Sequence, residues 1–174
     1  EEYIEIPRRL NLDDKIIVDA KNHEKLTPKE IISVSSQIGA SKIAIAIGYD
    51  ELKQTYYDFG FTKPVSLNFP STAFGYMNIK EKVADKELAS LGYGYGITVS
   101  PFQIASAYSV FANKGFRKDF KIIQSEETTQ DKIITEESSI HILDALKKVV
   151  KEGTGRAAEV RGFSEGGKTG TVHQ

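Results

Sequence analysis

The sequence predicts a mixed α/β fold in which helices pack on a sheet within one unit. Several segments combine helical spacing of apolar residues with capping signals, and strand-like stretches occur near both ends of the chain. We find no internal repeat, no low-complexity tract and no domain boundary. The 174 residues, of which 40% are hydrophobic, are enough to bury one core.

The first part of the chain is predicted to hold a strand and a helix in two pieces. The stretch "EEYIEIPRRL" alternates polar and apolar residues, which indicates a short strand that ends at Pro7. Residues 26–48 have helical character, with Thr27 as a good N-cap and a break at Ser35 and Ser36. Within this stretch "IAIAI" suits a strand by its period, but its alanines favour a helix.

Two further helices are predicted before residue 115. The stretch "YDELKQTYYDFGF" places Leu52, Tyr56 and Phe59 on one helical face, and residues 62–84 look like a long irregular connection. Ser100 is the expected N-cap of the helix in "SPFQIASAYSVFANKG". The predicted buried stripe of this helix is Ile104, Tyr108 and Phe111.

The last third is predicted to hold a strand, a long helix and the beginning of a second strand. The stretch "RKDFKIIQS" resembles a strand, and "QDK" a turn. Thr135 is expected to begin the last long helix and Gly153 to end it. The final "KTGTV" has the β-branched residues with which a strand begins.

Composition excludes several classes of function. The net charge is −1, with 23 basic and 24 acidic residues well mixed, so no nucleic-acid partner is indicated. The chain has no cysteine, which excludes disulfides, thiolate metal sites and a cysteine nucleophile. The longest apolar stretch, residues 43–48, is far below the roughly 20 residues of a transmembrane helix. No metal site is expected, because no two of the three histidines have metal-ligand spacing: His23, His141 and His173.

Two short stretches have both a structural and a functional interpretation. In "SVSSQIG", residues 33–39, a helix break exposes hydroxyl groups, which can either cap the following helix or serve a site. In "GYGYGITVSP", residues 92–101, glycines alternate with tyrosines. This loop can approach a ligand closely, or it can be a simple turn before a helix.

The third stretch, "GTGRAAEVRGFSEGGKTGT", ends in Lys168, Thr169, Gly170 and Thr171. An ammonium, a hydroxyl and a backbone without a side chain then share one edge of a strand. The cation and the hydroxyl can hold a substrate carboxylate, and the glycine lets the substrate lie along the strand. A neighbouring backbone N–H can stabilise an oxyanion, so this combination suits acyl transfer.

Together and in this order, the three stretches resemble the class B penicillin-binding proteins, the peptidoglycan D,D-transpeptidases, and most closely the cell-division type. This serine acyltransferase class carries S-x-x-K, S-D-N and K-T-G motifs. The resemblance covers Leu26 to Thr171. It implies a penicillin-binding transpeptidase or serine β-lactamase-like fold, with helices on a mainly antiparallel sheet, incomplete in this chain.

The resemblance implies a role for each matching residue. The candidate catalytic residues are Ser35, which passes protons as the second-motif serine, and Lys168, which polarises the site. The backbone N–H of Thr171 is expected to be one oxyanion donor. Gln37 replaces the usual asparagine that binds the substrate amide, and its extra methylene changes the reach of that amide. The candidate substrate-binding residues are Gln37, Thr169, Gly170 and Thr171.

The nucleophile of the family is absent from this chain. No serine is followed by lysine three residues later, and the one threonine that is, Thr129, stands in a turn-like polar stretch. We therefore expect the S-x-x-K segment to lie upstream of Glu1. Residues 1–174 are then the C-terminal part of a single transpeptidase domain, inactive on its own.

The resemblance implies that the parent protein crosslinks D-Ala-D-Ala stem peptides of peptidoglycan in septal wall synthesis and binds β-lactam antibiotics covalently, with no cofactor. It also implies cell-division proteins as partners. The expected location is a periplasmic or extracytoplasmic domain, anchored to the inner membrane by an N-terminal segment that this chain does not show. The alternative is a catalytically degenerate, transpeptidase-like scaffold or β-lactam sensor, which the missing nucleophile and Gln37 favour.

Overall fold

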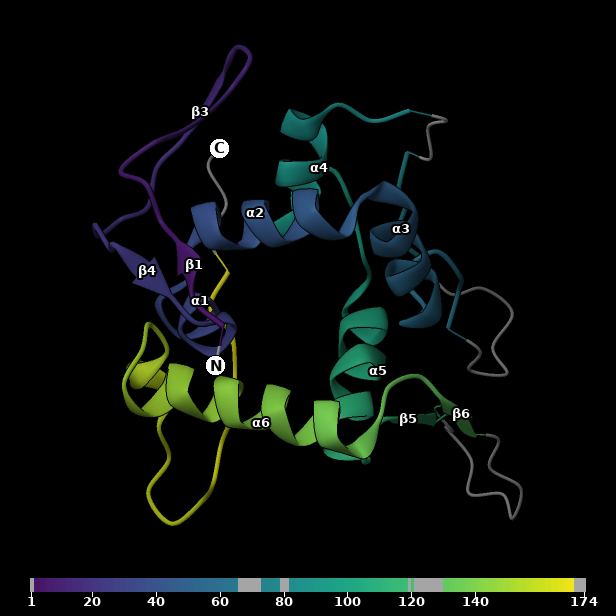
Figure 1. The fold of residues 1–174 in the computed structure, drawn as a ribbon. Coiled ribbons are helices and arrows are strands. Elements are labelled where there is room, and N and C mark those ends of the chain that lie inside the picture. Colours follow the sequence, from purple (N-terminus) through teal and green to yellow (C-terminus); the bar gives the residue numbers. More distant parts are fainter. Residues whose placement is uncertain (1, 66–72, 79–81, 119, 121–129, 171–174) are drawn as a thin grey trace.

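The computed structural model describes residues 2–65, 73–78, 82–118, 120 and 130–170, and these residues form six α-helices (Figure 1). Helix α1 contacts both α2 and α6, α5 contacts the other part of α6, and α2 also packs on α3 and α4. A short 3-10 helix, η1, follows α6. The bounds are α1 Pro28–Val34, α2 Gln37–Ile47, α3 Tyr49–Asp58, α4 Asp85–Gly92, α5 Pro101–Ala112, α6 Glu136–Lys151 and η1 Arg156–Ala158.

The strands form three separate antiparallel pairs. They are β1 (Ile4–Glu5) with β4 (Lys25–Leu26), β2 (Leu10–Leu12) with β3 (Lys15–Ile17), and β5 (Phe116–Lys118) with β6 (Gln130–Lys132). The predicted mixture of helices with antiparallel strands is therefore confirmed. In the described residues the helices pack mainly on one another.

Several local predictions are confirmed, one is wrong and one is tested only in part. The helix break at Ser35 and Ser36 is present, "IAIAI" is helical, and Thr135 caps α6. The predicted turn "QDK" is instead strand β6, because residues 130–132 pair in register with β5. The predicted strand at "KTGTV" is not seen in its described part, residues 168–170, and the remainder lies outside the described residues.

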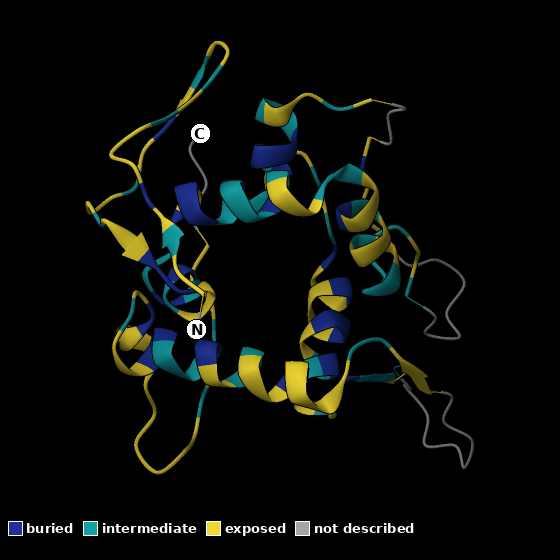
Figure 2. Cartoon of the chain, viewed as in Figure 1, coloured by how far each residue is buried: buried dark blue, intermediate teal, exposed yellow. Residues whose placement is uncertain are grey.

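The predicted buried face of α5 is also wrong. Ile104 and Tyr108 are 44% and 38% exposed and Phe111 is half-buried, whereas Gln103, Ala107 and Val110 are buried. Figure 2 shows that α5 carries both buried and exposed residues. Gln103 is fully buried because its amide is saturated with hydrogen bonds. Its Oε1 accepts from the backbone N–H groups of Gly75 and Ser100, both at 2.8 Å, and its Nε2 donates to the carbonyls of Gly60, Phe61 and Lys63.

The glycine-rich loop before α5 is a turn in this structure. Gly94 and Gly96 have φ values of 90° and 88°, which favour glycine, and the added Cβ of Gly94 would meet nothing within 4 Å. Gly92 is needed for a close approach, since a Cβ there would lie 2.5 Å from the Cβ of Ala44 in α2. The glycines therefore shape the chain between α4 and α5.

Candidate active site

Ser35 lies in the break between α1 and α2, in an uncommon backbone conformation. It has φ 60° and ψ 44°, the left-handed region, which costs a residue with a Cβ about 1–2 kcal/mol. The backbone N–H of Ser36 donates to Ile31 at 3.0 Å, which closes the end of α1. Such backbone strain in a non-glycine residue is frequent at functional sites.

One serine of the break caps the following helix, and the other is available for a site. Ser36 caps α2, because its Oγ accepts from the backbone N–H of Gly39 at 2.9 Å and donates to Asp19 at 2.5 Å. The other oxygen of Asp19 accepts from the backbone N–H of Ile38 at 3.0 Å. Asp19 and Ser36 thus hold the start of α2, and the hydroxyl of Ser35 points elsewhere. Sequence analysis missed Asp19, which stands 17 positions before Ser36.

The hydroxyl of Ser35 meets the lysine of the C-terminal motif. Lys168 Nζ donates to Ser35 Oγ at 2.6 Å and to the carbonyl oxygen of Thr169 at 3.0 Å. Partial burial of its ammonium lowers the pKa of Lys168 below its ordinary value. The described residues give it no carboxylate partner that would oppose this effect. Two candidate residues 133 positions apart therefore share a hydrogen bond.

Thr154 completes this group, and sequence analysis did not select it. Its Oγ1 lies 3.1 Å from Ser35 Oγ and 2.9 Å from Thr169 Oγ1. The available signal was the "GTG" of residues 153–155, in which two glycines flank a hydroxyl. We name Ser35, Thr154, Lys168 and Thr169 the hydroxyl–lysine cluster.

Close packing of α1 on the end of α6 brings the cluster together. A Cβ on Gly153 would lie 2.3 Å from the carbonyl oxygen of Ser33, so only glycine allows the two backbones to approach this closely. The segment before Lys168 returns alongside α6, because the backbone N–H of Gly167 donates to the carbonyl oxygen of Leu146 at 3.2 Å. The two chain segments that carry Thr154 and Lys168 are therefore both held against α6.

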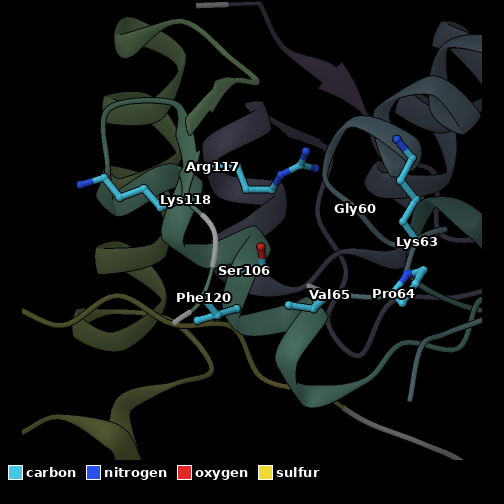
Figure 3. Close-up of a pocket in the computed structure, with 8 residues that line it drawn as sticks. All are labelled: Gly60, Lys63, Pro64, Val65, Ser106, Arg117, Lys118 and Phe120. Atoms are coloured by element: carbon cyan, nitrogen blue, oxygen red, sulfur yellow. The ribbon is translucent and has the colours of Figure 1, made fainter. Parts of the chain in front are cut away.

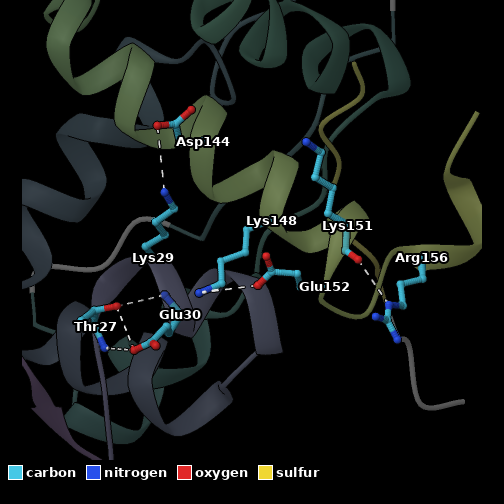
Figure 4. A network of polar contacts seen from close by, with 8 residues as sticks. All are labelled: Thr27, Lys29, Glu30, Asp144, Lys148, Lys151, Glu152 and Arg156. Atoms are coloured by element: carbon cyan, nitrogen blue, oxygen red, sulfur yellow. Dashed lines mark hydrogen bonds and ion pairs between the residues drawn. The ribbon is translucent and has the colours of Figure 1, made fainter. Parts of the chain in front are cut away.

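Figure 4 shows the polar contacts at the start of α1 and along α6, of which one joins the two helices. Thr27 and Glu30 form a complete capping box at the start of α1, with the Thr27 backbone N–H donating to the Glu30 carboxylate at 2.9 Å. Lys29 of α1 lies 4.0 Å from Asp144 of α6, but both side chains are exposed, so this pair contributes little. Beyond α6, Arg156 Nε donates to the carbonyl of Lys151 at 3.3 Å.

Of the remaining predicted site residues, the two that the structure describes are exposed. Gln37 is exposed at the first position of α2, two residues after Ser35. Gly170 is exposed, with nothing within 4 Å of an added Cβ, while Thr171 lies outside the described residues. The described residues contain no group of three metal-ligating side chains.

A pocket elsewhere does not belong to this site (Figure 3). It lies between α5, β5 and the chain after α3. Its one guanidinium is already engaged, because Arg117 donates to the carbonyl of Asp58 at 2.7 Å and to the carboxylate of Asp131 at 2.8 Å. Its lining residues are Gly60, Lys63, Pro64, Val65, Ser106, Arg117, Lys118 and Phe120.

The cluster joins an ammonium of lowered pKa to three hydroxyl groups. A hydroxyl at hydrogen-bonding distance from such an amine can exchange a proton with it. The same donors can hold a carboxylate. This arrangement is suited to proton transfer beside a bound anion.

Comparison with known proteins finds that the chain is similar to peptidoglycan transpeptidases. The family model of the penicillin binding protein transpeptidase domain matches residues 7–174. The chain is 31% identical over 158 residues to the peptidoglycan D,D-transpeptidase FtsI of Buchnera aphidicola subsp. Schizaphis graminum, covering 90% of this chain and 28% of that protein. It is also 31% identical over 170 residues to the probable peptidoglycan D,D-transpeptidase PbpC of Pseudomonas aeruginosa, covering 97% and 30%.

A solved structure agrees with these relatives. The transpeptidase domain of penicillin-binding protein 3 from Burkholderia pseudomallei superposes with a TM-score of 0.90 at 30% identity, covering 96% of this chain and 52% of that one. The chain spans less than a third of the length of the two curated relatives. No helix in the described part of the chain has the length and apolar character needed to cross a membrane.

Proposed function

Because the chain belongs to the transpeptidase domain family of penicillin-binding proteins, we propose that its parent protein crosslinks peptidoglycan by serine acyl transfer. The substrates are stem peptides ending in D-Ala-D-Ala, and β-lactams acylate the same nucleophile. The observation that carries the proposal is the 2.6 Å hydrogen bond from Lys168 Nζ to Ser35 Oγ, which joins the second and third motifs.

The reaction has two steps with a covalent intermediate. A serine outside this chain, in an S-x-x-K segment upstream, loses its proton and attacks the carbonyl of the penultimate D-Ala. The bond to the terminal D-Ala breaks, its amine takes up a proton, and an acyl-enzyme forms. An amine of a neighbouring stem peptide then attacks the acyl-enzyme carbonyl, so that a new amide bond forms, the ester bond to the serine breaks, and a proton from the amine returns to the serine oxygen.

The residues of this chain hold the substrate and move protons. Ser35 and Lys168 carry the proton towards the leaving amine, in keeping with their short hydrogen bond and the lowered pKa of Lys168. Thr169 and Thr171 bind the terminal carboxylate together with Lys168, beside the open backbone of Gly170. Gln37 binds the substrate amide, and the backbone N–H of Thr171 is one oxyanion donor.

Exposed apolar side chains support the proposal that residues 1–174 are the C-terminal part of one larger domain. Phe102, Ile104 and Tyr108 of α5 and Ile140 of α6 are 53%, 44%, 38% and 51% exposed. Burial beneath further chain would give each of them the usual hydrophobic gain. We place this domain outside the cytoplasm, on a protein anchored to the inner membrane, with cell-division proteins as partners in septal wall synthesis.

The second candidate is a catalytically degenerate scaffold or a β-lactam sensor. Gln37, where the resemblance leads us to expect asparagine, favours it, because an altered amide reach weakens productive substrate binding. A sensor would still bind β-lactams, whereas a scaffold would not.

Labelling of the parent protein with a fluorescent penicillin tests the proposal. We expect wild type to be labelled, with the adduct on an upstream serine identified by mass spectrometry. Lys168→Ala and Ser35→Ala should each lower the labelling rate by about 10²–10³, the usual cost of losing one essential polar group. A folded wild-type protein that takes no label would overturn the enzyme proposal in favour of the scaffold, and stable labelling without transpeptidation of stem peptides would indicate the sensor.

A further inference from the structure

Four polar groups form a continuous line across the hydroxyl–lysine cluster. The distances are 2.6 Å from Lys168 Nζ to Ser35 Oγ, 3.1 Å from Ser35 Oγ to Thr154 Oγ1, and 2.9 Å from Thr154 Oγ1 to Thr169 Oγ1. All three lie within hydrogen-bonding range. A proton position at one end of this line therefore constrains every position along it.

A charged Lys168 favours one direction of the line. An ammonium has donors only, so Ser35 Oγ must accept from it and has its own proton left for Thr154. Thr154 then donates to Thr169 Oγ1, which also lies 3.4 Å from Lys168 Nζ. With its oxygen occupied by these donors, Thr169 presents its own proton outwards.

A neutral Lys168 permits the reverse direction. Its lone pair can accept from Ser35, Ser35 from Thr154, and Thr154 from Thr169. Thr169 then presents lone pairs outwards, which repel a carboxylate. The line thus links the charge of Lys168 to the hydrogen-bonding character of Thr169, and Thr154 is its middle member.

The backbone holds Thr154 in this place. Gly153 donates to Lys148 at 3.0 Å and Gly155 donates to Val149 at 3.0 Å, so both neighbours of Thr154 are tied to the last turn of α6. The side chain is exposed, and its position follows from this anchored backbone. The backbone of Thr154 is therefore held at the end of α6, within reach of the hydroxyls of Ser35 and Thr169.

We propose that Thr154 is a positioning residue that couples the protonation of Lys168 to recognition of the substrate carboxylate by Thr169. This inference rests on the proposed function. It assigns Thr154 no contact with the reacting atoms. Its hydroxyl orders the hydrogen bonds of Ser35 and Thr169.

The test compares Thr154→Val with Thr154→Ser in the parent protein. Valine keeps the β-branched shape and removes the hydroxyl, whereas serine keeps the hydroxyl. The readout is the acylation rate with a penicillin and with the methyl ester of the same penicillin, which lacks the carboxylate charge. We expect Thr154→Val to slow acylation by the free acid about tenfold, the effect of one hydrogen bond to a charged group, and acylation by the ester less than twofold. Thr154→Ser should stay within about twofold of wild type for both.

A second readout separates coupling from simple structural support. Without Thr154 the charged form of Lys168 has a weaker acceptor in Ser35, so the limb of the pH–rate profile that belongs to Lys168 should move to lower pH in Thr154→Val. It should not move in Thr154→Ser. An equal loss of rate with acid and ester, or an unmoved limb, would refute the role of Thr154.

The two proposals fail in different ways. Labelling of wild type tests the proposed function, and only the comparison between variants tests Thr154. If Thr154→Val melts more than about 2 °C below wild type, Thr154→Ala replaces it, with the same expected difference between acid and ester. Wild-type labelling with all Thr154 variants equal to it would leave the transpeptidase proposal intact and reject the coupling.

Discussion

Replacement of Gly153 by alanine tests the contact that assembles the hydroxyl–lysine cluster. The new Cβ would lie 2.3 Å from the carbonyl oxygen of Ser33 and 2.9 Å from Cα of Val149. Both are backbone atoms that cannot rotate away, so α1 must move from the end of α6 to relieve the contact with Ser33, and the chain after α6 must shift to relieve the contact with Val149. Overpacking of this kind costs about 3 kcal/mol at the upper end of its usual range. Alanine returns up to about 1 kcal/mol by restricting the unfolded chain, which leaves a net loss of about 2 kcal/mol.

In the parent protein the domain is larger than this chain, which covers 52% of a solved transpeptidase domain, so this loss corresponds to a Tm lower by about 2–4 °C. The assay is thermal unfolding of the parent protein, followed by circular dichroism. Gly167→Ala is the matched control, because its Cβ would lie 3.8 Å from Val150 Cγ2, an ordinary contact, and should leave Tm within about 1 °C. Below its Tm, Gly153→Ala should also label more slowly with penicillin, since Ser35 and Thr154 no longer meet. Equal Tm values for the two variants would refute the close approach of α1 and α6 at this glycine.

Two further predictions concern buried and capping polar groups. Gln103→Leu should lower the free energy of unfolding by at least about 3 kcal/mol, because it leaves two N–H groups and three carbonyls without their partner. Gln54→Leu, at an exposed position of α3, should change the free energy of unfolding by less than about 0.5 kcal/mol. Urea unfolding measures both variants, and similar losses would show that the buried hydrogen bonds of Gln103 do not stabilise the fold. Hydrogen bonds from the Thr27 backbone and hydroxyl lower the pKa of Glu30 in the folded protein. The charged Glu30 carboxylate therefore stabilises the folded state fully above the pKa of Glu30 in the unfolded chain, about 4.3, and this stabilisation is lost as the pH falls through the lower pKa of the folded state. Between about pH 6 and pH 3, urea unfolding should therefore show that the free energy of unfolding falls more steeply for wild type than for Glu30→Gln. An equal or shallower fall for wild type would show that the cap does not favour the charged carboxylate.

The sequence was sufficient to predict features that depend on neighbouring residues. The helix break at Ser35 and Ser36 follows from local capping chemistry, and the structure shows it. Lys168 could be selected because its tripeptide has a chemical meaning in the context of the other two stretches. In each case the signal lies within a few positions of the residue concerned.

Contacts between distant positions could not be predicted in this way. Asp19 is one of many acidic residues until the fold places it beside Ser36, and Thr154 reaches Ser35 across 119 positions. The exposed stripe on α5 has another cause. Spacing predicts that Ile104 and Tyr108 share a face, but which face is covered depends on what packs against the helix, and in this chain α5 buries its small residues and Gln103 instead.

The route by which Ser35 and Lys168 meet explains why glycine is so prominent in the third stretch. Ser35 ends α1. Lys168 can reach it only if the chain after α6 reverses direction and passes in van der Waals contact with α1. Gly153 allows the turn to pass against Ser33, and Gly166 lets the returning segment pass Leu146, where a Cβ would already lie at 3.0 Å. The glycines thus set the spacing of the backbones, and that spacing brings an ammonium and three hydroxyls within hydrogen-bonding distance.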